Sequence, residues 1–136
     1  MRMMILIRFI IAVCLMSITA CQSNTSIDQS KSKTEEIRIE NSINKNLDLI
    51  IANKNTRLSS NPTDYINANK KHYEEITNTG DQGFKFLYGE LKQSSNDGLK
   101  EWIMAKACED ILKEKKPSIQ WTSGKDWLQQ YEKIKT

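Results

Sequence analysis

From Glu35 onward, the apolar residues of this chain recur at intervals of three and four positions, and this spacing constrains the fold more than any other feature. It places side chains on one face of an α-helix, because a helix turns once in about 3.6 residues. The clearest run is Ile39, Ile43, Leu47, Ile50 and Ile51. A half-buried strand would instead alternate apolar and polar residues, and no segment does so convincingly. The pattern therefore predicts an all-α fold.

Turn-forming residues divide this helical pattern into segments. Asn61 followed by Pro62 is typical of a helix start, since asparagine caps the first turn and proline suits the first helical position. Gly80 is placed to end that helix. The cluster Ser-Ser-Asn-Asp-Gly at 94–98 predicts another turn. We expect helices over about 35–51, 62–79, 81–93, 99–116 and from 123 onward.

The third and fourth of these helices are joined by a short polar turn, so we expect them to pack as a hairpin. The segment 80–112, which begins Gly-Asp and holds both helices, resembles a single HEAT-type repeat. One repeat does not make a solenoid, which needs about three. A domain of about 100 residues is long enough to bury a core. The expected architecture is therefore a small bundle of about five helices with a HEAT-like helical hairpin inside it.

Residues 1–20 have the layout of a secretory signal peptide. The stretch from Met1 to Arg8 carries two positive charges and no negative one, a short apolar run follows, and small residues precede Cys21. The alternative is an uncleaved membrane anchor, but a spanning helix needs about 20 apolar residues and this run is shorter. We therefore expect residues 1–20 to be removed.

The end of this segment carries a more specific signal. Ile18, Thr19, Ala20 and Cys21 resemble the lipobox of bacterial lipoproteins, an aliphatic residue and two small residues before a cysteine. The resemblance implies that a diacylglyceryl group is attached to the Cys21 thiol, and that a signal peptidase recognises the three preceding residues and cuts before Cys21. Two or three acyl chains hold a protein durably on a bilayer. The alternative is an ordinary signal peptide followed by chance by a cysteine.

Residues 21–33 are the expected tether between the lipid and a domain at 34–136. After Cys21 this stretch is polar, rich in serine and holds a single apolar residue, so it predicts a flexible coil. Ser32 and Glu35 fit a capping box, which predicts that the first helix starts there. Without residues 1–20 the formal charge of +3 falls to about +1, a balance that gives no footprint for nucleic acid.

Few residues could act as a nucleophile or hold a metal. Once Cys14 leaves with the signal peptide and Cys21 is lipidated, Cys108 is the remaining thiol, so no intramolecular disulfide is expected. Cys108 sits in an apolar helical stretch, which favours a buried inert thiol over a nucleophile paired with His72. His72 and Glu75 lie one helical turn apart, but zinc sites need three or four ligands.

The carboxylates give no clear catalytic pair either. Glu109 and Asp110 are adjacent in the sequence, so on a helix they point in different directions. Two distant aspartates such as Asp81 and Asp97 could meet as a glycosidase-type pair, but nothing in the sequence selects them. Phosphate-binding glycine loops and serine-nucleophile motifs are absent from the sequence. We therefore expect no catalytic site, no cofactor and no metal.

The segment Trp-Thr-Ser-Gly-Lys-Asp-Trp at 121–127 is the candidate partner surface. Its two tryptophans flank a turn at which Thr122 or Ser123 is placed to cap a last helix. If exposed, the two rings would form an aromatic anchor for a partner. If buried, they would close the bundle as core residues. The candidate residues for this surface are Trp121, Lys125 and Trp127.

Three segments of the chain resemble a group of uncharacterised Gram-positive lipoproteins and secreted proteins. They read SNPTDYI from Ser60, GLKEWIMAKAC from Gly98 and WTSGKDW from Trp121. A similar helical module occurs on the outer tails of some membrane-bound sensor peptidases. The resemblance, which covers residues 60–131, implies a location and a fold. It carries over no catalytic residue, because no activity is established for that group.

Together these features predict a lipid-anchored helical protein on the extracytoplasmic face of the cell membrane, or of the outer membrane and periplasm in a host with two membranes. The expected role is a non-catalytic binding module, held to the membrane by the lipid on Cys21, with a protein partner in the cell envelope. Two other functions stay open: a cell-envelope hydrolase, and an immunity or sequestration lipoprotein. The oligomeric state is also open.

The anchor can be tested directly. We expect Cys21→Ala to move the protein from the membrane fraction to the soluble extracytoplasmic fraction, because the thiol that carries the lipid is lost. Cell fractionation and immunoblotting measure this, with Cys108→Ala as the matched control that stays in the membrane. Retention of the Cys21→Ala protein in the membrane fraction would contradict the lipid anchor.

Overall fold

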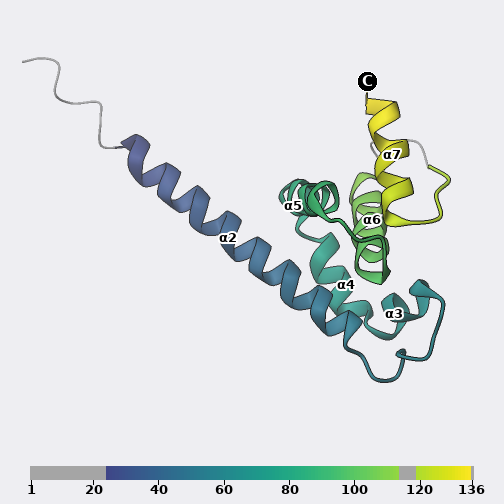
Figure 1. Cartoon of the computed structure of the whole chain (residues 1–136). Coiled ribbons are helices and arrows are strands. Elements are labelled where there is room, and N and C mark those ends of the chain that lie inside the picture. Colours follow the sequence, from purple (N-terminus) through teal and green to yellow (C-terminus); the bar gives the residue numbers. More distant parts are fainter. Residues whose placement is uncertain (1–23, 114–118, 136) are drawn as a thin grey trace, which may run out of the picture. The chain divides into compact units, whose positions relative to one another are not determined.

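The computed structural model describes residues 24–113 and 119–135. All regular structure in these residues is α-helical, which confirms the predicted all-α class (Figure 1). The helices are α2 (Asn24–Ile51), α3 (Pro62–Ala68), α4 (Lys70–Thr77), α5 (Gly80–Gln93), α6 (Leu99–Leu112) and α7 (Gly124–Lys135). The predicted signal peptide at 1–20 and the lipobox ending at Cys21 lie outside the described residues. No helix within the described ranges is both long enough and apolar enough to span a membrane.

The first helix begins earlier than predicted. α2 starts at Asn24, so Ser32 lies inside the helix and residues 24–33 are helical, where we predicted a coil. Within this stretch, the Thr34 hydroxyl donates a hydrogen bond at 2.9 Å to the carbonyl of Ser30, which lies one helical turn earlier. Once a helix has nucleated, each added residue costs little, so a helix can extend into a polar sequence. The chain divides into two compact units, Met1–Glu35 and Glu36–Thr136.

Within Glu36–Thr136, α6 is the central helix. α3, α4, α5 and α7 all pack against it (Figure 1). A helix covered on several sides buries more than one stripe of side chains, and α6 buries Glu101, Ile103, Met104, Ala105, Ala107 and Cys108. Around these the other helices contribute Ile43, Leu47, Ile50, Tyr65, Tyr73, Ile76, Leu87, Leu91, Trp127 and Tyr131. This core holds the starts of α3, α6 and α7 in place.

The prediction of a single helix over 62–79 is wrong, because the helix is interrupted at Asn69, which separates α3 from α4. The Asn69 backbone leaves the helical region, with φ −129° and ψ 35°. Its side-chain amide donates to the Tyr65 carbonyl at 2.8 Å and accepts from the Asn53 side chain at 2.9 Å. Asparagine competes in this way with the helical hydrogen bonds of the backbone. The described residues therefore hold six helices, close to the expected number of about five.

The predicted helical hairpin is present. α5 and α6 pack against each other and are joined by the turn at 94–98. The turn from α4 into α5 is made at Gly80, whose φ of 59° is the left-handed conformation that glycine adopts without strain. The hairpin places the end of α5 beside the start of α6, where the polar turn residues gather.

Candidate functional site

The three helices α3, α6 and α7 begin in the same way. In each, a residue before the first turn is followed three positions later by an acid, whose negative charge suits the positive end of the helix dipole. The pairs are Asn61 with Asp64, Gly98 with Glu101, and Ser123 with Asp126. One such pair occurs in each of the three segments 60–66, 98–108 and 121–127.

At the start of α3 the predicted cap is confirmed. The side-chain oxygen of Asn61 accepts a hydrogen bond from the Thr63 N–H at 3.1 Å, and Pro62 is the first helical residue. Asp64 accepts a hydrogen bond from the Ser59 hydroxyl at 2.5 Å. The carboxylate thus holds the loop before the helix against its first turn.

At the start of α6, Glu101 is a buried residue, 5% exposed. It accepts hydrogen bonds from the Gly98 N–H at 2.9 Å and from the Ser94 hydroxyl at 2.8 Å. Burial alone would raise the pKa of Glu101, but these two hydrogen bonds, together with its own backbone N–H and the charge of Lys100, outweigh burial and lower the pKa. A buried charge is tolerated here because both donors are fixed by the turn.

At the start of α7, Ser123 is the capping residue, one of the two predicted. Its hydroxyl accepts from the Asp126 N–H at 3.2 Å, and Asp126 accepts from the Thr122 N–H at 2.9 Å. The next residue, Gly124, is buried, and a methyl group there would lie 2.6 Å from the carbonyl carbon and oxygen of Glu101. Only glycine lets the two helix starts approach this closely.

The turn between α5 and α6 ties the start of α7 to both helices. Asp97 accepts from the Ser123 hydroxyl at 2.6 Å and from the Lys125 N–H at 3.0 Å. The ammonium of Lys125 donates to the Leu91 carbonyl at 2.9 Å and also to the carbonyl of Ser94. A positive charge is favourable at this point, because it faces the negative end of the α5 dipole.

The three residues of the candidate partner surface lie in different places. Trp127 is 1% exposed and stacks on Tyr131, with ring centroids 5.1 Å apart, so it is a core residue and cannot contact a partner. The ammonium of Lys125 is held by α5 as described. Trp121 is half-buried, with its ring 5.1 Å from that of Trp102 and its N–H donating to Glu109 at 3.0 Å. The three residues therefore do not form one exposed surface.

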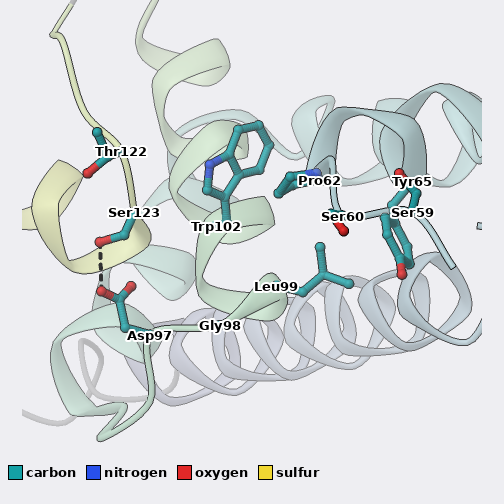
Figure 2. Close-up of a pocket in the computed structure, with 10 residues that line it drawn as sticks. All are labelled: Ser59, Ser60, Pro62, Tyr65, Asp97, Gly98, Leu99, Trp102, Thr122 and Ser123. Carbon is teal, nitrogen blue, oxygen red and sulfur yellow. Dashed lines mark hydrogen bonds between the residues drawn. The ribbon is translucent and has the colours of Figure 1, made fainter. Parts of the chain in front are cut away.

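A groove of about 310 Å³ lies between the starts of α3, α6 and α7 (Figure 2). Figure 2 shows Asp97 and Ser123 on one side of Trp102, and the residues that lead into α3 on the other. The lining residues are Ser59, Ser60, Pro62, Tyr65, Asp97, Gly98, Leu99, Trp102, Thr122 and Ser123. Sequence reasoning missed this site, and the signal that could have found it is the repeated pattern of cap and acid in three separate segments.

The residues considered for catalysis are not gathered in this groove. Cys108 is fully buried, and burial raises the pKa of its thiol. His72 lies on α4, with its Nδ1 2.9 Å from the side-chain oxygen of Asn46. Asp97 lines the groove, whereas Asp81 lines another pocket of about 390 Å³, so the two do not form a carboxylate pair in one site. Over 24–113 and 119–135, no three His, Cys, Asp or Glu side chains are grouped so as to hold a metal ion.

The adjacent acids Glu109 and Asp110 support the packing of α6. Both accept hydrogen bonds from the Lys106 ammonium, at 3.1 and 2.7 Å. Asp110 also accepts from the Tyr73 hydroxyl at 2.8 Å. Burial raises the pKa of Tyr73, and the nearby Asp110 carboxylate raises it further. This network joins α4 to α6 and, through Trp121, to the segment before α7.

Comparison of the chain with protein-family models, curated proteins and solved structures gives no match. Evidence on function therefore comes from the groove itself. Its lining combines two aromatic side chains, two aliphatic side chains, four serine and threonine hydroxyls and one carboxylate. A concave surface of this mixed composition can orient a ligand by hydrogen bonds while apolar contacts supply affinity.

The buried carboxylate of Glu101 gives a test of this geometry. We expect Glu101→Gln to lower the free energy of unfolding by about 1–3 kcal/mol, because the amide cannot accept from both donors. Since the pKa of Glu101 is lowered on folding, its contribution is present above the pKa of the unfolded chain and is lost as the pH falls through the folded value. Urea unfolding between about pH 7 and pH 3 measures both effects.

The matched control is Glu75→Gln, since Glu75 is exposed on α4. It should change the free energy of unfolding by less than about 0.5 kcal/mol. Equal stability of the two variants at neutral pH, or an unchanged acid dependence in Glu101→Gln, would contradict the role given to the buried carboxylate.

Proposed function

We propose that this protein is a lipid-anchored helical module that binds a partner in the cell envelope, on the extracytoplasmic side, without catalysing a reaction. The observation that carries the proposal is the groove at the three helix starts. It is built from segments far apart in the sequence, at 59–65, 97–102 and 122–123. At Gly124, where a methyl group would lie 2.6 Å from the Glu101 backbone, the starts of α6 and α7 approach closely, and this contact brings two of these segments together.

The anchor part of the proposal is supported by the sequence. The basic head, the short apolar run and the lipobox-like end at Cys21 agree with one another. Lipidation at Cys21 would leave the folded unit Glu36–Thr136 outside the cytoplasm, where an envelope partner could reach the groove.

The binding part is supported by the chemistry of the groove lining. A serine nucleophile needs a general base, most often histidine, and the one histidine of the chain is not among the lining residues. The hydroxyls of Ser59 and Ser123 instead donate to Asp64 and Asp97 and hold the loops in place. Leu58, which precedes the lining residue Ser59 in the sequence, is 92% exposed, an apolar contact available to a partner.

The proposal can be tested by photo-crosslinking in living cells. A benzophenone amino acid at Ser60, an exposed residue on the groove, should give one dominant adduct with an envelope component. The probe is not placed at Lys125, because that side chain holds α5 and α7 together. Mass spectrometry of the adduct then identifies the partner and shows whether it is intact.

The matched control carries the same probe at Gln82, an exposed residue on α5 that does not line the groove. It should give no adduct of the same mass. Absence of an adduct from a well-expressed, membrane-bound Ser60 probe would contradict the binding module. Recovery of the partner only as a cleaved or modified product would favour an envelope hydrolase.

A further inference from the structure

We infer that the groove receives a cationic side chain, such as that of lysine, from an extended peptide segment of the partner. The inference rests on the proposed binding function and names the chemistry that the groove recognises. It follows from four features of the lining: where its hydroxyl protons point, which charge it carries, how its apolar residues are placed, and how many backbone donors are already used.

Three lining hydroxyls direct their protons to carboxylates. Ser59 donates to Asp64 at 2.5 Å and Ser123 donates to Asp97 at 2.6 Å. In the same way, Thr122 donates to Asp126 at 3.2 Å. A hydroxyl has one proton and two lone pairs. Ser59 and Ser123 also accept one backbone N–H each, from Asn61 and Asp126, so what they have left for a ligand is one acceptor site. Donation to a carboxylate also polarises the hydroxyl oxygen and strengthens it as an acceptor. The groove therefore favours a ligand rich in donors.

The charge of the groove agrees with this. Among the residues that the structure shows lining it, Asp97 is the only charged one. Its two oxygens accept one hydrogen bond each within the protein, whereas a carboxylate can accept about four. Asp97 is exposed, so the remaining acceptor sites can be reached from solvent. A ligand with a positive charge is the electrostatic complement of this side chain.

The apolar part of the lining suits the rest of such a side chain. Trp102 lies between Asp97 and the residues leading into α3, with Leu99 and Pro62 nearby (Figure 2). The aliphatic stem of lysine packs on apolar surface while its charged end reaches a polar partner. A cation within about 6 Å of an indole ring is also attracted by the ring. The groove volume of about 310 Å³ is at the small end of ligand pockets, which suits one long side chain with its flanking backbone.

An anion is the alternative ligand, because helix N-termini commonly bind anions through free N–H groups. Here three such groups, in the first turns of α3 and α7, are already donating within the protein. The Thr63 N–H donates to Asn61, the Lys125 N–H to Asp97, and the Asp126 N–H to Ser123. Each of the three first turns also holds an acid, which would repel an anion. These features favour a cation over an anion in the groove.

The test is an NMR titration of the 15N-labelled full chain, purified from expressing cells in a nonionic detergent. Three capped heptapeptides are compared: one with two lysines among alanines and glycines, one with both lysines Nε-acetylated, and one with glutamates in their place. We expect the lysine peptide to shift the amide signals of Gly98, Leu99 and Thr122. The acetylated peptide should bind at least about tenfold more weakly, because it has lost the charge, and the glutamate peptide should not bind.

Two aspartate variants test whether the carboxylate of Asp97 attracts the lysine peptide. Asp97→Asn should weaken binding of the lysine peptide at least about threefold, and added salt should reduce the difference from wild type. Asp48→Asn, on the exposed face of α2 and away from the groove, is the matched control with unchanged binding. The comparison of acetylated and free lysine needs no variant, so it holds even if Asp97→Asn folds poorly.

Equal binding of the lysine and acetylated peptides, tighter binding of the glutamate peptide, or shifts outside the groove would each overturn the inference. So would the absence of any binding by the lysine peptide while the Ser60 probe still gives its adduct in cells. In that last case the binding function would stand and only the cationic ligand would be excluded.

Discussion

The structure depends on one close backbone approach, between the first turn of α7 and the first turn of α6. Gly124 is buried against the Glu101 backbone, with no room for a methyl group. The same Glu101 carries a buried carboxylate that fixes the turn at 94–98 through Ser94 and Gly98. Because the two helix starts meet here, Asp97 can accept hydrogen bonds from Ser123 and Lys125. The same contact places Thr122 and Ser123 along the groove.

The polar residues of the three shared segments have two roles. They first satisfy backbone N–H groups that a helix leaves unpaired at its start, as Asn61 does for α3 and Ser123 for α7. In the groove lining, the hydroxyls of Ser59 and Ser123 direct their protons to carboxylates, so they offer a ligand acceptor capacity. The same hydrogen bonds that hold the helices together therefore give the groove its acceptor character, and from it we infer the cationic ligand.

Local rules predicted the features that depend on neighbouring residues. The all-α class follows from apolar spacing, and the cap at Asn61 and the chain turn near Gly80 follow from the chemistry of those residues. The break at Asn69 could not be predicted, because it depends on a hydrogen bond from Asn53, far back in the sequence. Likewise, nothing local distinguishes buried Trp127 from half-buried Trp121. The groove is hardest to predict, since its walls come from three separate segments.

The most direct measurement compares the unfolding free energies of Gly124→Ala and Gly89→Ala with that of the wild-type chain. At Gly89, in the middle of α5, an added methyl group meets nothing within 4 Å. Alanine should therefore stabilise that position by about 0.5–1 kcal/mol through its better helix propensity.

At Gly124 the added methyl group meets Glu101 backbone, which cannot move aside as a flexible side chain would. We predict a loss of about 1–3 kcal/mol or more, together with changed NMR amide signals at Asp97 and Ser123. If Gly124→Ala is as stable as Gly89→Ala and these signals are unchanged, the two helix starts do not meet as described. The groove between them would then lose its structural basis.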